Sequence, residues 1–177
     1  STGKYVRLSV AVNLWLVELN DPLHFNALSM EMASDMRAAA KWLAAQECDS
    51  IKSMVLQAAG DHFCPGGNMY RLYASPASLA AAARASFDLF DGFYQLRTLP
   101  VPVVCAAHGS VLGGGLAICL LTDFVICNEP ATFQVGERSR GIYPAGLLTH
   151  TLADAVGAEM ATELYHTEVK LTSAQAC

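Results

Sequence analysis

Three consecutive glycines at positions 113–115 constrain this chain more than any other feature of its sequence. They follow an apolar run at 102–107 that predicts a strand, and they precede a second apolar run at 116–121 that predicts a helix. A glycine inside a helix costs roughly 1 kcal/mol relative to alanine, so three in a row require an explanation. Backbone without Cβ atoms lets a ligand approach the free N–H groups at a helix N-terminus, where negative charge is favoured. The pattern therefore predicts a site for a phosphate or for a developing oxyanion.

The glycines alone leave two interpretations open, an anion site and tight packing of a buried helix on a sheet. No Lys-Ser or Lys-Thr pair follows them, which excludes a nucleotide-binding P-loop, and their spacing is not that of a dinucleotide-binding fingerprint. A second glycine turn at 63–67, Phe-Cys-Pro-Gly-Gly, follows another predicted strand at 53–57. Two turns that each aim a backbone N–H into one cleft are typical of an oxyanion hole for an acyl or thioester carbonyl.

Composition narrows the class of protein. A chain of 177 residues is long enough for one domain with a sizeable core. Its residues are 53% hydrophobic and only 15% charged, and this hydrophobic excess predicts either a large interface or covering structure that is missing here. No apolar run reaches the ~20 residues of a membrane-spanning helix, and no apolar signal segment opens the chain. The net charge of −5 argues against nucleic acid. We expect neither a membrane nor a nucleic-acid partner.

The six cysteines lie mostly inside apolar runs, and none forms a Cys-x-x-Cys pair or a Cys/His cluster with metal spacing. We therefore expect buried, reduced thiols and no metal site. Such cysteine usage is typical of a reducing compartment, the cytoplasm or an organellar matrix.

Hydrophobic periodicity predicts alternating strands and helices. Alternation over 6–16 predicts two strands separated by a turn near 11–13. Ser29 is the predicted N-cap of a helix to about residue 45. A second helix is expected from Ser75-Pro76 to about Leu96, with an aromatic packing face. That face comprises Phe87, Phe90, Phe93 and Tyr94. Further predicted elements are a strand at 123–128, a short strand near 132–135, and helices near 145–155 and 157–166. The order favours an α/β fold.

A series of segments resembles, in order and spacing, the crotonase (enoyl-CoA hydratase/isomerase) superfamily. They are 26–29, 63–68, 102–109, 112–115, 122–127, 133–137, 141–146 and 171–176. The resemblance implies one core domain over 1–177, the crotonase spiral of ββα units, with active sites between its layers. Family members continue well beyond the last segment, so we expect the C-terminal trimerisation helices to be absent here. Whether the chain is a fragment, a module of a longer chain or a short homologue stays open. The resemblance implies a homo-oligomer, a trimer where those helices exist.

The resemblance also implies which groups carry the chemistry. The oxyanion donors would be the N–H groups of Gly67 and Gly114. Enoyl-CoA hydratases carry one glutamate at the position of Ala117 here, and a second at the position of Glu137. The alternative for Glu137 is a salt bridge to an arginine on a solvated turn at 138–140.

Substrate binding in the family is mainly by main chain. The resemblance assigns it to Ala27, Leu28 and Gly66, and to His62 beside the first glycine turn. Asn68 replaces the usual aspartate after that turn, which weakens any role for position 68 as a base. Tyr143 and His150 are further pocket candidates, and His108 is expected to be structural. The expected substrate is a thioester of coenzyme A or of an acyl carrier, with no other cofactor.

The number of carboxylates decides the expected reaction. Hydration needs one group to activate water and another to handle the α-proton, and only Glu137 is evident. We therefore expect an isomerase, or related lyase or decarboxylase chemistry, in fatty acid or polyketide metabolism. The alternative is a non-catalytic acyl-CoA-binding or interaction module that kept the fold, which the alanine at position 117 also favours.

Overall fold

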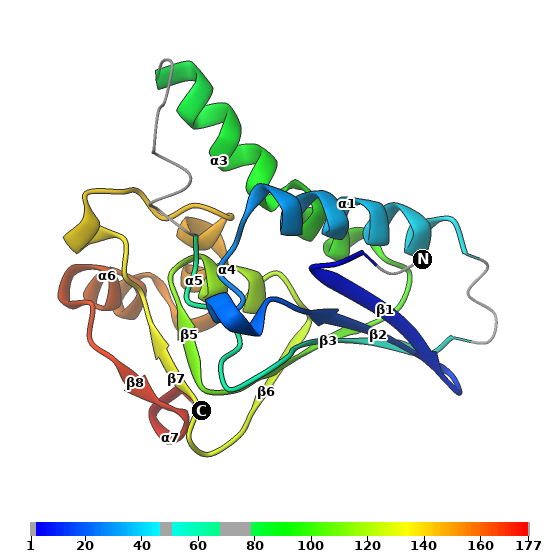
Figure 1. Cartoon of the computed structure of the whole chain (residues 1–177). Coiled ribbons are helices and arrows are strands. Elements are labelled where there is room, and N and C mark those ends of the chain that lie inside the picture. Colours follow the sequence, from blue (N-terminus) through cyan, green and yellow to red (C-terminus); the bar gives the residue numbers. More distant parts are fainter. Residues whose placement is uncertain (1–2, 47–50, 68–78, 177) are drawn as a thin grey trace.

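The computed structural model describes residues 3–46, 51–67 and 79–176 (Figure 1). Its larger sheet has five strands in the order β1-β2-β3-β4-β6. These are β1 (Val6–Ala11), β2 (Leu14–Leu19), β3 (Ser53–Ala58), β4 (Val103–Ala107) and β6 (Phe124–Cys127). The first two strands are antiparallel and the others run parallel. A turn at Val12, with φ of 53°, separates β1 from β2, as the alternation predicts.

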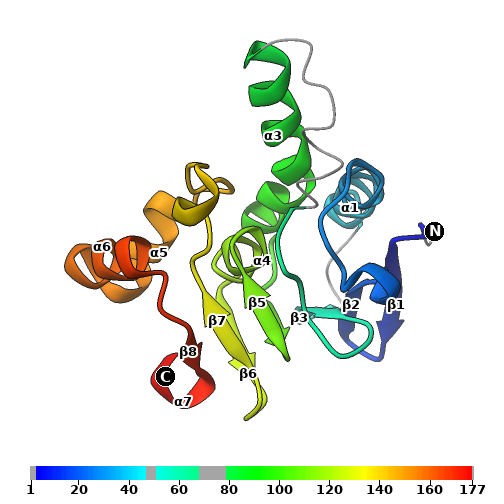
Figure 2. The same ribbon diagram turned by 60° about the vertical axis from the view of Figure 1, so that its left-hand side comes forward.

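Two long helices cover one face of this sheet (Figure 2). They are α1 (Met30–Ala44) and α3 (Leu79–Tyr94), and the latter continues as a 3₁₀ turn, η2 (Gln95–Thr98). Ser29 caps α1 as expected, because its hydroxyl accepts the N–H of Met32 at 3.1 Å. Gly92 lets the helices approach closely: a Cβ on it would lie 2.5 Å from the amide nitrogen of Arg37. The predicted start of the second helix at Ser75-Pro76 lies outside the described residues.

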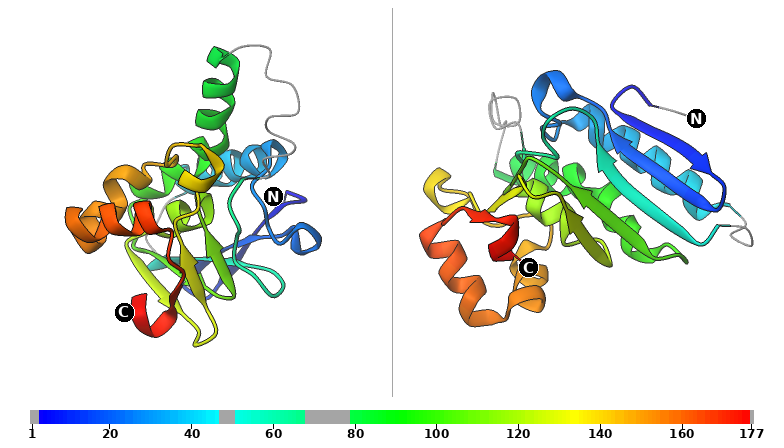
Figure 3. Two further views of the ribbon diagram at one scale, coloured as in Figure 1. Left: turned by 90° about the vertical axis from the view of Figure 1, so that its left-hand side faces the viewer. Right: turned by 90° about the horizontal axis from the view of Figure 1, so that it is seen from below.

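A smaller three-stranded sheet stands beside the first, in the order β5-β7-β8. Its strands are β5 (Ser110–Leu112), β7 (Thr132–Gln134) and β8 (Leu171–Thr172). The short helix α4 (Gly114–Cys119) connects β5 of the smaller sheet to β6 of the larger one. The remaining elements are η1 (Pro22–His24), η3 (Arg138–Arg140), α5 (Leu148–Val156), α6 (Ala158–Thr167) and α7 (Ser173–Ala176). Figure 3 shows α5 and α6 at the side of the molecule opposite the N-terminus.

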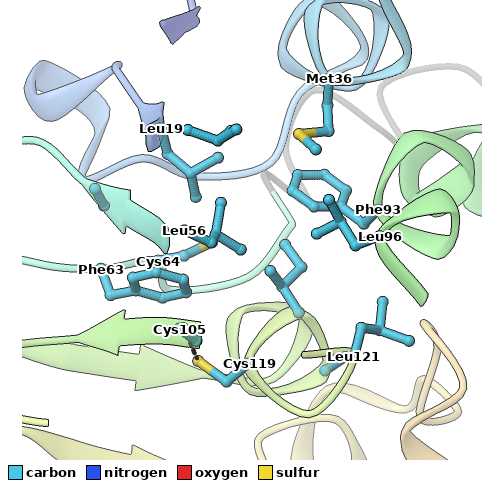
Figure 4. Close-up of a cluster of buried hydrophobic side chains, with 14 of the residues drawn as sticks. Leu19, Met36, Leu56, Phe63, Cys64, Phe93, Leu96, Cys105, Cys119 and Leu121 are labelled. Atoms are coloured by element: carbon cyan, nitrogen blue, oxygen red, sulfur yellow. Dashed lines mark hydrogen bonds between the residues drawn. The ribbon is translucent and has the colours of Figure 1, made fainter. Parts of the chain in front are cut away.

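The core lies between the larger sheet and the helices (Figure 4). Met36 of α1 faces Phe93 on α3, and all atoms of both side chains are buried. The thiol of Cys105 donates a hydrogen bond to the sulfur of Cys119 at 3.5 Å, and these two cysteines, like Cys64 and Cys127, form no disulfide. Among the described residues, Cys64, Cys105 and Cys119 are buried, as predicted, whereas Cys127 is partly exposed.

Two expectations from the sequence need correction. Phe87 does not belong to the packing face of α3, because it is 52% exposed and only Phe90 and Phe93 are buried. The strand β5 was not expected, since it is three residues long and its pairing partner β7 lies far along the chain. No helix among residues 3–46, 51–67 and 79–176 is long and apolar enough to cross a membrane.

The face of the larger sheet opposite α1 and α3 is uncovered within the described residues. Leu16, Val55, Val104 and Phe124 pair in register across four strands on this face. The first three are partly exposed and Phe124 is 62% exposed. We call these four residues the open row. A continuous apolar row of this kind is typical of a surface that another structure covers.

Candidate active site

The two glycine turns that the sequence singles out lie directly against each other. A Cβ on Gly66 would lie 3.1 Å from the amide nitrogen of Gly114, and a Cβ on Gly114 would lie 3.4 Å from the Cα of Gly66. Gly66 also has a φ of +93°, which few other residues adopt. At Gly66, both the close approach and the positive φ therefore favour glycine.

Backbone hydrogen bonds hold the first turn against the smaller sheet. The N–H of Cys64 donates to the carbonyl of Ser110 at 3.2 Å, and the N–H of Leu112 donates to the carbonyl of Cys64 at 3.1 Å. On its other side, the N–H of Leu28 donates to the carbonyl of Gly66 at 2.8 Å. The turn is therefore fixed from both sides, independently of any ligand.

The three glycines of the second turn serve different purposes. A Cβ on Gly115 would lie 2.0 Å from the carbonyl oxygen of Cys64, so this glycine is required for packing. Gly113 adopts a φ of +52° at the N-cap of α4, and its N–H donates to the carbonyl of Gln134. Gly114 is the first helical residue and faces the first turn. The packing interpretation of the triple glycine thus holds at Gly115, and approach of a ligand at Gly114 stays a prediction.

Gly67 and Gly114 offer free donors. Within the part of the chain that the structure describes, neither backbone N–H has a hydrogen-bond acceptor. Apolar side chains border Gly114, since a Cβ on it would lie 3.1 Å from Cζ of Phe90 and 3.2 Å from Cδ1 of Leu28. Two free N–H groups on adjacent turns, in apolar surroundings, can stabilise a developing oxyanion.

Glu137 lies beside these donors with its carboxylate buried. The residue is 4% exposed, and a Cβ on Gly113 would lie 2.9 Å from its Oε1. Its Oε2 accepts the N–H of Gly136 at 2.8 Å. Burial raises the pKa of Glu137, opposed by backbone hydrogen bonds; the charge of Glu168 also raises it, and that of Arg140 lowers it.

The salt-bridge alternative for Glu137 is wrong. Among the described residues Glu137 forms no ion pair, and Arg138 and Arg140 are both exposed on the turn that follows it. The guanidinium of Arg140 donates instead to the carbonyl of Gly136. A buried carboxylate with a raised pKa is suited to proton transfer.

Position 117 is closed as well as uncharged. Ala117 is fully buried, and a Cβ on Gly146 would lie 2.8 Å from its Cβ and 2.7 Å from Cε1 of Phe90. The segment before α5 and the ring of Phe90 thus fill the space beside Ala117. Sequence reasoning did not identify either contact, because Gly146 and Phe90 come from separate segments and no local pattern joins them.

The segments predicted to bind the carrier arm are tied to one another. Asn26 is fully buried with a φ of 59°, and its side-chain amide donates to the carbonyls of Ala59 and His62, both at 2.8 Å. This clamp holds Ala27 and Leu28 beside the first glycine turn. Ala27 is half-buried, whereas Leu28 is buried under the turn. Asparagine is one of the few residues other than glycine that tolerate the left-handed conformation. This preference could have predicted the role of Asn26.

The histidines support loops. His62 accepts the N–H of Ser110 at Nδ1, at 3.2 Å, and its ring lies 5.4 Å from that of Phe25. His108 contacts the carbonyl of Gly60 at 3.0 Å through Nε2, the structural role expected of it. Among the described residues no contact joins the His62 side chain to Gly67 or Gly114, so its predicted role in the pocket stays a prediction.

The other candidates lie farther out. Tyr143 is 65% exposed and its hydroxyl is 3.4 Å from that of Ser86, and His150 is exposed on α5. Asn68 lies outside the described residues. Among residues 3–46, 51–67 and 79–176, no three His, Cys, Asp or Glu side chains are grouped so as to hold a metal ion.

Comparisons with known proteins agree with this architecture. Residues 10–177 match the family model described as enoyl-CoA hydratase/isomerase. A probable enoyl-CoA hydratase, EchA14 of Mycobacterium tuberculosis, is 31% identical over 156 residues, which are 88% of this chain and 59% of that protein.

Solved structures share the fold. An enoyl-CoA hydratase from Polaromonas sp. JS666 superimposes with a TM-score of 0.87 and 26% identity, over 96% of this chain and 65% of the other. A putative enoyl-CoA hydratase from Thermobifida fusca in complex with acetoacetyl-CoA gives 0.84 and 20% identity, over 98% and 70%. The chain thus spans about three-fifths of the length of the curated relatives it matches.

Proposed function

This chain belongs to the enoyl-CoA hydratase/isomerase family, and we propose that it binds an acyl thioester and stabilises its enolate between the N–H groups of Gly67 and Gly114. The observation that carries the proposal is the contact between the two glycine turns, where Gly66 lies against Gly114. Abstraction of a proton beside the thioester carbonyl places negative charge on the carbonyl oxygen. Two preorganised donors stabilise that charge, and loss of one such donor typically costs ~3–4 kcal/mol of the barrier.

Glu137 is the proposed base. Its carboxylate lies next to Gly113, the neighbour of the donor Gly114, and it is shielded from solvent. The ionised carboxylate would take a proton from the carbon next to the thioester. Its raised pKa then favours holding that proton until it is returned to the substrate.

A single base favours transfer of a proton between two carbons of the same substrate. Water addition needs a second group, and position 117 offers an alanine whose surroundings are filled by Gly146 and Phe90. Double-bond isomerisation of an enoyl thioester, or related lyase or decarboxylase chemistry through the same enolate, therefore fits the site better than hydration.

The proposed substrate class is an acyl thioester of coenzyme A or of an acyl carrier protein. Family membership supports it, since the family model is described by enoyl-CoA chemistry. The clamp that Asn26 forms between two loops would support a carrier arm by main chain at Ala27 and Gly66. Parallel assays with the coenzyme A and carrier forms of one acyl group would distinguish the two carriers.

Deuterium exchange tests this proposal. The protein is incubated with trans-3-hexenoyl-CoA in D₂O, and mass spectrometry follows deuterium entering the acyl group and conversion to the 2-enoyl isomer. We expect both, and we expect Glu137→Gln to abolish both. The exposed Glu159 of α6 gives a matched control, Glu159→Gln, which should keep both activities. Thioester binding without exchange would instead support the non-catalytic module.

A further inference from the structure

Glu168 ends helix α6 in a conformation that glutamate rarely adopts. Its φ is 49°, in the left-handed region that favours glycine, and its N–H donates to the carbonyl of Leu164 at 2.9 Å. Such a residue persists where its surroundings fix it, and strained residues of this kind gather at functional sites. The contacts of Glu168 show what fixes it.

Two hydrogen bonds join Glu168 to both sides of the segment that carries Glu137. Its backbone carbonyl accepts the side-chain amide of Gln134 at 2.7 Å, and its carboxylate accepts the N–H of Ser139 at 3.1 Å. Residue 134 precedes Glu137 and residue 139 follows it. Gln134 also accepts the N–H of Gly113 at 3.0 Å through its carbonyl. Hydrogen bonds thus connect Glu168 to the segment that carries the base and, through Gln134, to the oxyanion loop.

Charge adds to this geometry. The side chain of Ser139 is the main reason why the pKa of Glu168 is held below its ordinary value, and the backbone N–H of Ser139 lowers it further. Glu168 therefore remains ionised where Glu137 titrates. The charged groups that act on Glu137 are Glu168, which favours its protonated form, and Arg140, which favours its ionised form. The oxyanion loop beside it contributes only uncharged glycines.

We propose that Glu168 is a positioning residue for the base: its carboxylate holds the 138–140 turn and thereby keeps the Glu137 carboxylate against Gly113. The role rests on the proposed function of Glu137. Glu168 does not itself reach the substrate in this account. It acts through the backbone on either side of Glu137 and through its charge.

Two substitutions separate this role from a merely structural one. Glu168→Gly removes the carboxylate, but glycine adopts the left-handed conformation without strain. The melting temperature should therefore stay the same or rise. The rate of deuterium exchange into trans-3-hexenoyl-CoA should nevertheless fall at least tenfold, because displacement of a reacting group by about 1 Å can cost ~10²-fold.

Glu168→Gln keeps an oxygen that accepts from Ser139 and removes the charge. It should keep most of the rate and shift the acid limb of the pH–rate profile to lower pH. Glu163→Gln, an equal charge change on the exposed side of α6, is the control and should change neither.

An NMR titration of carboxyl-labelled protein makes the test independent of turnover. With the Glu137 signal assigned from Glu137→Gln, its midpoint should move to lower pH in Glu168→Gln and stay in place in Glu163→Gln. Glu168 variants that match Glu163→Gln in rate, pH profile and titration would overturn the proposal. So would a Glu168→Gly protein whose melting temperature falls in step with its rate. Absence of exchange in the unaltered protein would instead count against the proposed function, and the titration would still decide the influence of Glu168.

Discussion

The carboxylate of Glu137 occupies the space that a side chain at Gly113 would need: a Cβ there would lie 2.9 Å from Oε1 of Glu137. Gly113 also holds the N-cap of α4, whose first residue is the proposed donor Gly114. The carboxylate of the base therefore lies against the residue that precedes the oxyanion donor. The close fit also means that a single methyl group should disturb the base without touching the donor.

Gly113→Ala should lower the exchange rate at least tenfold by displacing the Glu137 carboxylate. The matched control is Gly141→Ala. Gly141 has a similar φ of +67°, but nothing lies within 4 Å of where its Cβ would be. Gly141→Ala should lose about 1 kcal/mol of folding stability from left-handed strain. Gly113→Ala should lose more, because its φ of 52° and ψ of −115° lie outside the left-handed helical region, and urea denaturation measures both losses. Equal activity in the two variants would show that the Glu137 contact does not matter for catalysis.

Gly114→Val should abolish turnover and weaken acyl-thioester binding. Its branched side chain would meet the ring of Phe90 and the side chain of Leu28, and would fill the space the substrate carbonyl needs. Loss of one oxyanion donor typically raises the activation barrier by ~3–4 kcal/mol, which lowers the rate 10²–10³-fold. Circular dichroism checks that the variant folds. A folded Gly114→Val protein with full activity would show that the oxyanion assignment is wrong.

Much of this site is predictable from the sequence, and the part that is not has a physical reason. The glycine turns at 63–67 and 113–115 can be predicted because a free helix N-terminus and a close backbone approach both require glycines that are adjacent in the sequence. The capping of α1 by Ser29 is local in the same way. The contacts of Phe90 with Gly114 and of Gly146 with Ala117 join distant segments, so no local pattern reveals them. The position of Glu168 beside Glu137 is likewise set by tertiary packing.

The raised pKa of Glu137 predicts an unusual dependence of stability on pH. Because folding raises this pKa, mainly by burial, the folded state holds the proton more tightly than the unfolded state. The contribution to stability is therefore greatest below the ordinary carboxyl pKa and is lost as pH rises through the raised value. Glu137→Gln, which cannot ionise, should melt at a higher temperature than the unaltered protein at about pH 8 and at the same temperature near pH 4.

Catalysis should show the opposite dependence on pH, because only the ionised carboxylate can accept a proton. The exchange rate should rise with pH as Glu137 ionises, and its midpoint should lie above the ordinary pKa of a glutamate, because burial raises the pKa of Glu137. A midpoint at or below the ordinary pKa of a glutamate would contradict burial of the base in the active protein.

The open row predicts self-association of this chain. Leu16, Val55, Val104 and Phe124 form a continuous apolar strip across the larger sheet. This chain should bind a hydrophobic dye and sediment as more than a monomer, and Phe124→Lys should reduce both. Leu23→Lys, at an 88% exposed site on η1, is the control. A monomer without dye binding would show that the strip is not an association surface.

The central claim is that one base, Glu137, moves a proton within an enolate held at Gly67 and Gly114, and the ratio of isomerisation to hydration tests it most directly. With trans-3-hexenoyl-CoA and trans-2-hexenoyl-CoA as paired substrates, isomerisation should exceed hydration at least ~100-fold, since general acid–base help is worth 10²–10⁴-fold. Glu137→Gln should abolish the isomerisation. Ala117→Glu should recover hydration better when combined with Phe90→Ala, because Phe90 and Gly146 fill the space around position 117. Efficient hydration by the unaltered protein, or isomerisation that survives Glu137→Gln, would contradict the account and make His62 the first residue to test as a replacement base.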